Sequence, residues 1–244
     1  MMAAATRIAM WSGPRNISTA MMRSFEARGD TAVTDEPFYA AYLHRTGIDH
    51  PLRDEVIASQ SLDSSEIAAV LAGPVPGGKP IWYQKHMTLH LLEGFEQDWM
   101  SQVLNAFLIR DPPAVLASYA SKRSHVTLAD LGFVQQRELF EREAERLGSP
   151  PPVVDAADIV ANPARTLARL CEALGIVFTP SMLGWPRGPR PTDGVWGPAW
   201  YQSVERSTGF EARELKCTAV LPPTLQRLAD EAQPHYEALK VYCL

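Results

Sequence analysis

The amino-acid sequence predicts a three-layer α/β/α protein, in which a mostly parallel central sheet is covered by helices on both faces. Short apolar runs, each too short for a helix, alternate along the chain with longer segments of helical periodicity. This alternation is typical of parallel strands joined by crossover helices. The 244 residues show no internal repeat and no low-complexity linker, so we expect a single domain over residues 1–244.

The composition is that of an ordinary globular protein, with 46% hydrophobic and 21% charged residues. The net charge of -5 argues against a general nucleic-acid binder. The cysteines have no metal-type spacing, and their odd number fits a reducing compartment; they are Cys171, Cys217 and Cys243. Residues 1–5 lack a signal-peptide pattern, and no apolar run is long enough for a bilayer. We therefore expect a soluble, cytoplasmic protein.

The first element expected is a strand, a tight turn and the start of a helix within residues 7–19. The apolar run from Ile8 to Trp11 is too short for a helix, and Ser-Gly-Pro at residues 12–14 is typical of a turn. Backbone N–H groups at the positive end of the following helix can bind an anion. One face of that helix is apolar, with its residues four apart: Ile17, Met21 and Phe25.

The side chains of this turn favour phosphate as the anion. Arg15 supplies a fixed cation, and Ser18 and Thr19 supply two hydroxyl donors. The Walker pattern of nucleotide triphosphatases is absent, because Ser18 and Thr19 occupy the positions of its second glycine and its lysine. The loop thus lacks the usual parts for splitting a magnesium-bound triphosphate. The alternative is a structural turn in which Arg15 is solvated.

The later elements follow from apolar runs and from helix start and stop signals. Further strands are expected at residues 31–34, 81–84, 105–109 and 152–154. Helices are expected at 64–71, 112–119, 127–147, 162–174 and 222–242, with a serine cap at Ser64 and a Thr127–Asp130 capping box. Residues 46–60 are weakly patterned, and the Pro- and Trp-rich residues 178–209 are expected to form an ordered loop region with a helix near 198–206.

Polar residues follow three of the expected strands. Asp35-Glu36 comes after the second strand, Lys85-His86 after the third and Arg110 after the fourth. In open α/β sheets the segments beyond the carboxyl ends of the strands line the ligand crevice. Arg110 and Ser118, eight residues apart, can together hold a further phosphate there. The alternative for this pair is a surface ion pair of Arg110 with Asp111 and an ordinary helical serine.

These residues resemble the motifs of sulfotransferases that use 3′-phosphoadenosine-5′-phosphosulfate (PAPS). The segment from Pro14 to Thr19 (Pro14, Arg15, Asn16, Ile17, Ser18 and Thr19) resembles their 5′-phosphosulfate loop, although Asn16 and Ile17 replace the usual Ser-Gly. Arg110 and Ser118 match their 3′-phosphate pair, and Lys85-His86 lies where cytosolic members carry Lys-x-Thr-His. The resemblance covers roughly residues 7–185. It implies a P-loop NTPase-like fold and transfer of a sulfuryl group from PAPS to a hydroxyl or amine, with no metal required.

The resemblance also implies roles for single residues. Arg190 is expected at the 3′-phosphate, and Trp196 or Trp200 on the adenine or the acceptor, against the alternative that they pack within a Pro-rich loop. Arg15 would stabilise the charge on the sulfuryl group, and Lys85 would assist at the bridging oxygen.

Two residues compete for the role of catalytic base. Glu36 resembles the catalytic glutamate of several bacterial and Golgi-type sulfotransferases, and His86 the catalytic histidine of the cytosolic ones. We favour Glu36, because an acidic pair followed by proline and aromatic residues is an unusual strand exit. The alternatives are a helix N-terminal carboxylate and a loop histidine. The remaining histidines show no pairing in the sequence: His44, His50, His90, His125 and His235.

The sequence does not identify the acceptor. Residues 39–60 and 178–200 are expected to form the loops around it, and their aromatic residues fit a small-molecule, lipid or carbohydrate acceptor. No nucleic-acid partner and no membrane span are expected, and a homodimer is left open. Two other functions remain: a P-loop phosphotransferase of a small metabolite, and a non-catalytic nucleotide-binding protein of the same fold.

Overall fold

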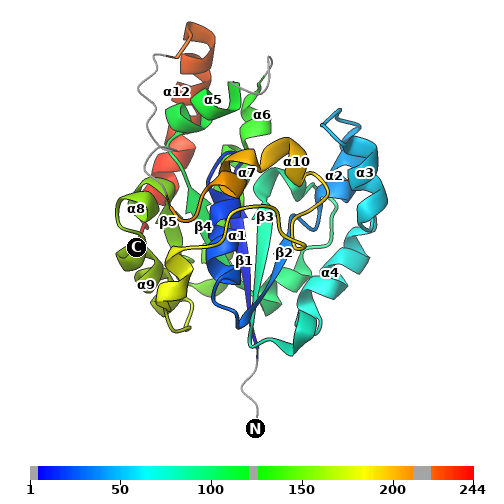
Figure 1. The fold of residues 1–244 in the computed structure, drawn as a ribbon. Coiled ribbons are helices and arrows are strands. Elements are labelled where there is room, and N and C mark those ends of the chain that lie inside the picture. Colours follow the sequence, from blue (N-terminus) through cyan, green and yellow to red (C-terminus); the bar gives the residue numbers. More distant parts are fainter. Residues whose placement is uncertain (1–4, 121–125, 211–220) are drawn as a thin grey trace.

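The computed structural model describes residues 5–120, 126–210 and 221–244. Five strands form one sheet in the order β2-β3-β1-β4-β5, and every neighbouring pair is parallel (Figure 1). The expected α/β class and parallel sheet are therefore confirmed. The strands are β1 (Thr6–Ser12), β2 (Thr31–Asp35), β3 (Ile81–Met87), β4 (Leu104–Ile109) and β5 (Val153–Asp155).

Helices connect the strands and cover both faces of the sheet. The α-helices are α1 (Ser18–Glu26), α2 (Tyr39–Thr46), α3 (Arg53–Ser59), α4 (Ser64–Ala72), α5 (Pro112–Ala120), α6 (Leu128–Leu131), α7 (Phe133–Leu147), α8 (Ala156–Ala161), α9 (Pro163–Ala173), α10 (Gly197–Trp200), α11 (Gln202–Arg206) and α12 (Pro223–Lys240). Short 3₁₀ turns are η1 (Pro76–Gly78), η2 (Thr88–His90), η3 (Asp98–Gln102) and η4 (Pro180–Leu183). Among the described helices, none is both long and apolar enough to cross a membrane.

The alternation of side chains along β1 divides the core into two layers. Ile8 and Met10 pack on one face of the sheet with residues of α1, α8 and α9. Ala9 and Trp11 pack on the other face with residues of α4, α7 and α12. In Figure 1, α1 lies across the near face of the strands. Because strands buried on both faces carry apolar side chains in both directions, β1 reads as a continuous apolar run.

The structure corrects several expected boundaries. Residues 39–60 contain α2 and α3 instead of a loop, and α4 is capped by Asp63, whose side chain accepts from the backbone N–H of Ser65. The helix expected over 127–147 is broken at Gly132, whose φ of 71° ends α6 and starts α7. β3 continues to Met87, beyond its expected end at residue 84. The sequence also missed α8, which follows β5 directly.

Other expected signals are confirmed, and two residues cannot be judged. The Thr127–Asp130 capping box is present, and the side chain of Asn162 caps α9 by accepting from the backbone N–H of Arg165. Cys217 and His125 lie outside the described residues.

Candidate active site

A cavity of about 250 Å³ lies at the carboxyl ends of the central strands. Three of the expected groups line it: the loop of residues 14–19, the pair Glu36 and Lys85, and the pair Arg110 and Ser118. The structure therefore brings together side chains that are up to about a hundred positions apart in the sequence, as the crevice rule for open α/β sheets predicts.

The loop of residues 14–19 has the backbone of an anion site. Arg15 and Ile17 adopt positive φ angles of 59° and 50°, and Ile17 is the N-cap residue of α1. Its aliphatic side chain offers no oxygen to the first N–H groups of the helix, so these remain available to an anion. The side-chain amide of Asn16 fixes the loop by donating to the backbone carbonyl of Leu108 over 2.7 Å.

Gly13 is required immediately before this loop. A Cβ atom at this position would lie 2.6 Å from the backbone oxygen of Leu131, which is closer than side chains come to backbone. The glycine thus lets the turn between α6 and α7 pack against the loop. The glycine usually found within the family's loop is replaced here by Ile17, which holds the left-handed conformation at a cost of about 1 kcal/mol or more.

The two expected phosphate motifs contact each other directly. Arg15 donates from Nε to Ser118 Oγ over 3.0 Å, and Arg110 donates from a terminal nitrogen to the backbone oxygen of Arg15 over 2.6 Å. The Arg110 residue is only 6% exposed. Two guanidinium groups and a hydroxyl therefore converge beside the N-terminus of α1, which concentrates positive charge at this end of the cavity.

Lys85 binds both acidic residues at the end of β2: Asp35, the last residue of the strand, and Glu36, which follows it. Its ammonium donates to Asp35 Oδ1 over 2.8 Å, to Glu36 Oε1 and to the hydroxyl of Tyr201 over 2.8 Å. Tyr201 in turn donates to Asp35 Oδ2 over 2.7 Å and accepts from the indole N–H of Trp196 over 2.8 Å. The Pro- and Trp-rich segment near the C-terminus thereby closes around the residues at the end of β2.

Burial changes the acid–base properties of this group. Desolvation raises the pKa of Glu36 above 4.5, and the charge of Lys85 opposes this effect without cancelling it. Burial by itself would lower the pKa of Lys85, but the carboxylates of Asp35 and Glu36 raise it above 10.5. Lys85 is therefore a permanent cation, while Glu36 has the raised pKa that suits a general base.

The backbone of Glu36 is strained. Its φ of 40° lies in the left-handed region, and its N–H donates to the backbone oxygen of Lys85 over 2.9 Å. Such strain costs about 1–3 kcal/mol and clusters at functional sites. The described residues contain four non-glycine residues with positive φ, and three of them line the cavity: Arg15, Ile17 and Glu36.

The structure does not bring His86 to the cavity. Because β3 continues to Met87, its side chains alternate, and His86 points away from Lys85 into the opposite face of the sheet. There it stacks on Trp11 at 4.4 Å between ring centroids and lies 5.3 Å from Trp99. Burial, with the charge of Lys85, lowers the pKa of His86 to about 3. Its position is that of a neutral core histidine.

Two other expected contacts are also not formed. Arg190 donates to backbone oxygens of its own loop and lies 3.8 Å from Glu26, away from the cavity. Trp196 is 1% exposed, and its indole N–H donates to the hydroxyl of Tyr201, so it positions Tyr201 and does not itself line the cavity. Trp200, by contrast, lines the cavity, as expected for one of the two tryptophans.

The other end of the cavity has an aromatic wall, and most of it comes from the two stretches, residues 39–60 and 178–200, that were expected around the acceptor; sequence reasoning missed His90. This wall is formed by Tyr39 and Tyr42 of α2, His50, His90 and Trp200. The sequence did contain a signal for His90, because it lies five residues after Lys85. With the end of β3 predicted correctly, this spacing would have placed His90 just beyond the strand, at the edge of the sheet. Tyr201 gave no comparable signal, because it reaches Asp35 from 166 residues away.

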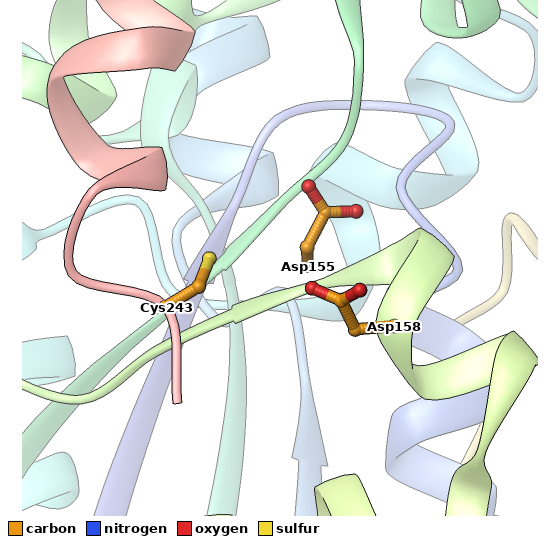
Figure 2. A group of neighbouring side chains, drawn as sticks. All are labelled: Asp155, Asp158 and Cys243. Atoms are coloured by element: carbon orange, nitrogen blue, oxygen red, sulfur yellow. The ribbon is translucent and has the colours of Figure 1, made fainter.

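A second cluster of acidic and sulfur side chains lies beyond the end of β5. Figure 2 shows Asp155, Asp158 and Cys243 as neighbouring side chains. Their possible ligand atoms all lie within 4.8 Å of one another. Lys240 already supplies the cation, because its ammonium donates to Asp155 over 2.9 Å and to Asp158 over 3.0 Å. Burial raises the pKa of the Cys243 thiol to about 12, so it is not a thiolate ligand near neutral pH.

Known structures with this fold include sulfotransferases. A sulfotransferase domain from a Synechococcus olefin synthase aligns with a TM-score of 0.61 and 16% identity, covering 96% of this chain and 95% of that domain. A mouse sulfotransferase, whose structure is complexed with PAP, aligns with a TM-score of 0.50 and 11% identity, covering 98% and 90%. At these identities the likeness concerns the fold.

The family follows from the sequence. Residues 6–243 match the family model described as "Sulfotransferase domain", and the chain belongs to this family. It is also 38% identical over 231 residues to the Arabidopsis thaliana protein named branched-chain-amino-acid aminotransferase-like protein 1. The match covers 94% of this chain but spans 41% of the length of that relative.

Proposed function

We propose that this protein transfers a sulfuryl group from PAPS to a hydroxyl or amine of an acceptor. The observation that carries the proposal is one cavity that is lined both by the cationic N-terminus of α1 and by the buried carboxylate of Glu36. One end is suited to the phosphates of a nucleotide, and the other end to the removal of a proton. Membership of the sulfotransferase family supports the same reading.

The phosphate end would bind and orient the donor. The N–H groups at the start of α1, together with Arg15, Ser18 and Thr19, would hold the 5′-phosphosulfate. Arg110 and Ser118 would hold the 3′-phosphate beside them. These contacts place positive charge where the bond between sulfur and the bridging oxygen breaks, and so they stabilise the negative charge of the leaving bisphosphate.

The other end would activate the acceptor. Glu36 would take the proton of the acceptor as its oxygen or nitrogen attacks sulfur, and its raised pKa favours this transfer near neutral pH. Lys85 fixes the carboxylate through Oε1 and keeps it aimed into the cavity. Its ammonium is held by three oxygens, so we assign it chiefly to positioning Glu36.

Selective binding of the nucleotide tests the proposal most directly. Adenosine 3′,5′-bisphosphate at about 100 times its dissociation constant stabilises a protein by about 2.7 kcal/mol. For a chain of this length we expect the melting temperature to rise by about 5–10 °C. AMP, and ATP with magnesium, should give smaller shifts, because neither carries a 3′-phosphate for Arg110.

Two arginine variants locate the site, and the outcomes separate the alternatives. Arg110→Ala should reduce the shift, whereas Arg169→Ala, an exposed arginine on α9, should retain it. Equal shifts with all three nucleotides would contradict the proposal. A larger shift with ATP and magnesium would favour a phosphotransferase, and bisphosphate binding without transfer to any acceptor would favour a non-catalytic protein.

Glu36→Gln tests the chemical step. The amide keeps the shape of the side chain but cannot take a proton, so we expect transfer from labelled PAPS to fall at least about 100-fold. The bisphosphate-induced shift should stay unchanged. Glu93→Gln, at an exposed glutamate, is the matched control. Full activity of Glu36→Gln would remove Glu36 from the role of base.

A further inference from the structure

His90 is a buried histidine whose ring is held firmly at the acceptor end of the cavity. It lies in η2, just beyond the end of β3, and it lines the cavity although it is only 4% exposed. Its ring stacks on the ring of Tyr39, with 4.5 Å between centroids and an interplanar angle of 7°. It also stacks on the ring of Tyr42, with 4.7 Å between centroids and an angle of 29°. Two aromatic neighbours therefore fix the direction in which its nitrogens point.

Nδ1 of His90 has no hydrogen-bond partner among the described residues, although it is buried. A buried polar atom without a partner costs about 1–3 kcal/mol, and such atoms are rare in native structures. Oε2 of Glu36 lies 3.8 Å from this nitrogen. This distance is too long for a direct hydrogen bond. The atom is therefore poised for a group that enters from the cavity.

The two carboxylate oxygens of Glu36 have different neighbours. Oε1 accepts from Lys85, whereas Oε2 faces His90. An oxygen placed about 2.7 Å from Oε2 and about 2.9 Å from Nδ1 satisfies ordinary hydrogen-bond lengths on both sides. A separation of 3.8 Å between the two atoms allows this arrangement. A single hydroxyl can thus donate to Glu36 and accept from His90 at the same time.

Building on the proposed function, we propose that His90 is a second catalytic residue, which binds the acceptor oxygen through Nδ1–H, and that the acceptor group is a hydroxyl. A hydroxyl has one proton and two lone pairs. The proton goes to Glu36, one lone pair accepts from His90, and the other attacks sulfur. A neutral amine has one lone pair, which is needed for the attack, so it cannot also accept from His90.

The step balances without any further reagent. The O–H bond of the acceptor breaks, and its proton moves to Oε2 of Glu36. A bond forms between the acceptor oxygen and sulfur, while the bond between sulfur and the 5′-phosphate oxygen breaks. The electron pair of that bond leaves with adenosine 3′,5′-bisphosphate. His90 keeps its proton throughout.

The surroundings of His90 fit this role. Burial lowers the pKa of His90 well below 6.5, and the positive charge of Lys85 adds to this effect, so the ring is neutral near pH 7. A neutral imidazole carries one N–H donor, and the acceptor group requires it on Nδ1. The walls beside it are aromatic or apolar and include Tyr42, Met87 and Leu89, which favours an uncharged, flat acceptor body.

Matched hydroxyl and amine probes test the inference. We would measure transfer from labelled PAPS to 2-naphthol and 2-naphthylamine, to benzyl alcohol and benzylamine, and to 1-octanol and 1-octylamine. At least one alcohol or phenol should be sulfated, at a rate at least about 100 times that of its amine partner. The inference would be overturned if an amine were sulfated at a rate comparable to that of its alcohol or phenol partner. It would also be overturned if no hydroxyl compound were sulfated.

Two substitutions distinguish the contribution of the His90 Nδ1–H donor from that of the stacked aromatic ring. His90→Phe keeps the stacking between the tyrosines but removes Nδ1, and we expect kcat/KM for the best hydroxyl probe to fall about 10- to 100-fold. His90→Asn restores a donor near the same place and should recover part of this loss. His44→Asn, at an exposed histidine of α2, is the control. Full activity of His90→Phe would exclude the role.

The bisphosphate-induced thermal shift keeps the two proposals apart. A wild-type protein that shows no such shift would refute PAPS use itself. A normal shift together with an unaffected His90→Phe would refute only the role of His90. If His90→Phe is misfolded and therefore lacks the thermal shift, the role of His90 is decided by comparing His90→Asn with the wild-type protein. A His90→Asn variant that shows a normal shift but no transfer would contradict the role, because its side chain still offers a donor.

Discussion

Two lysine clusters at the edge of the sheet have the same chemical plan. Lys85 binds Asp35 and Glu36 at the end of β2, and Lys240 binds Asp155 and Asp158 at the end of β5. Each cluster also includes a tyrosine hydroxyl: Tyr201 donates to Asp35 over 2.7 Å, and Tyr236 donates to Asp155 over 2.6 Å.

Solvent and strain distinguish the two clusters. The Lys85 side chain is 1% exposed, whereas that of Lys240 is 37% exposed. Only the Lys85 cluster, among those described, lines the cavity, and there Glu36 has a positive φ and an oxygen facing His90. The Lys240 cluster instead ties α12 to the end of β5. Similar ion pairs thus occur in two settings, and under the proposed function burial with access to a cavity separates an ion pair that serves a reaction from one that serves the fold.

The largest effect is expected from Lys85→Met. The substitution leaves two buried carboxylates side by side without their cation, and removing one partner of a buried ion pair costs about 3–5 kcal/mol. Urea denaturation should show this loss in the free energy of unfolding. Adding Asp35→Asn should recover part of it, because one of the two charges is removed. A loss below about 1 kcal/mol would mean that this cluster resembles that of Lys240 after all.

The second-largest effect is expected for the pH dependence of stability, and it comes from His86, on the face of β3 that points away from the cavity. The pKa of His86 is about 3 in the folded protein against 6.5 in the unfolded chain, so the unfolded chain binds more protons between these values. Stability should therefore fall as the pH drops below about 6.5, by up to about 1.4 kcal/mol per pH unit for this group. His86→Phe should flatten that slope while leaving bisphosphate binding intact. An unchanged slope in urea titrations from pH 7 to pH 5 would contradict this assignment.

The smallest effect is expected from Lys240→Met. Lys240 is partly exposed, so water screens its ion pairs, and Asp155 keeps its bonds from Tyr236 and from the backbone of Ala157. The free energy of unfolding should fall by about 1 kcal/mol or less in the same urea experiment. Sulfuryl transfer and bisphosphate binding should not change. A loss as large as that of Lys85→Met would erase the contrast between the clusters.

The sequence predicted the sheet, and it also predicted that Arg15, Arg110 and Ser118 lie close together, because the signals for both are local. Apolar runs mark the strands, and Arg15, Arg110 and Ser118 stand at fixed distances from strand ends, where the sheet brings them together. The orientations of Lys85 and His86 were harder to predict. Where β3 ends decides whether these residues continue the alternation of the strand, and so whether each side chain faces the cavity or the core.

The opposite end of the cavity was predicted only as two stretches, residues 39–60 and 178–200, and not residue by residue. Its residues come from α2, from η2 and from the segment around Tyr201, and no periodicity relates them. The pairing of His90 with Tyr39 and Tyr42 depends on how α2 packs beside η2, a tertiary contact without a local signature. The weak pattern of residues 46–60 concealed α3, because most of its residues face solvent and only Val56 is buried.

The hydrogen bond from Tyr201 to Asp35 has a consequence for the order of events during synthesis. The chain emerges from the ribosome N-terminus first, so β1, α1, β2 and β3 are all available before residue 201. Asp35 and Lys85 can pair early, but the tyrosine that completes their hydrogen bonds arrives 166 residues after Asp35. Under the proposed function, the nucleotide-binding residues are therefore synthesised before the tyrosine that completes the hydrogen bonds around Glu36, and competence for turnover marks the completion of folding.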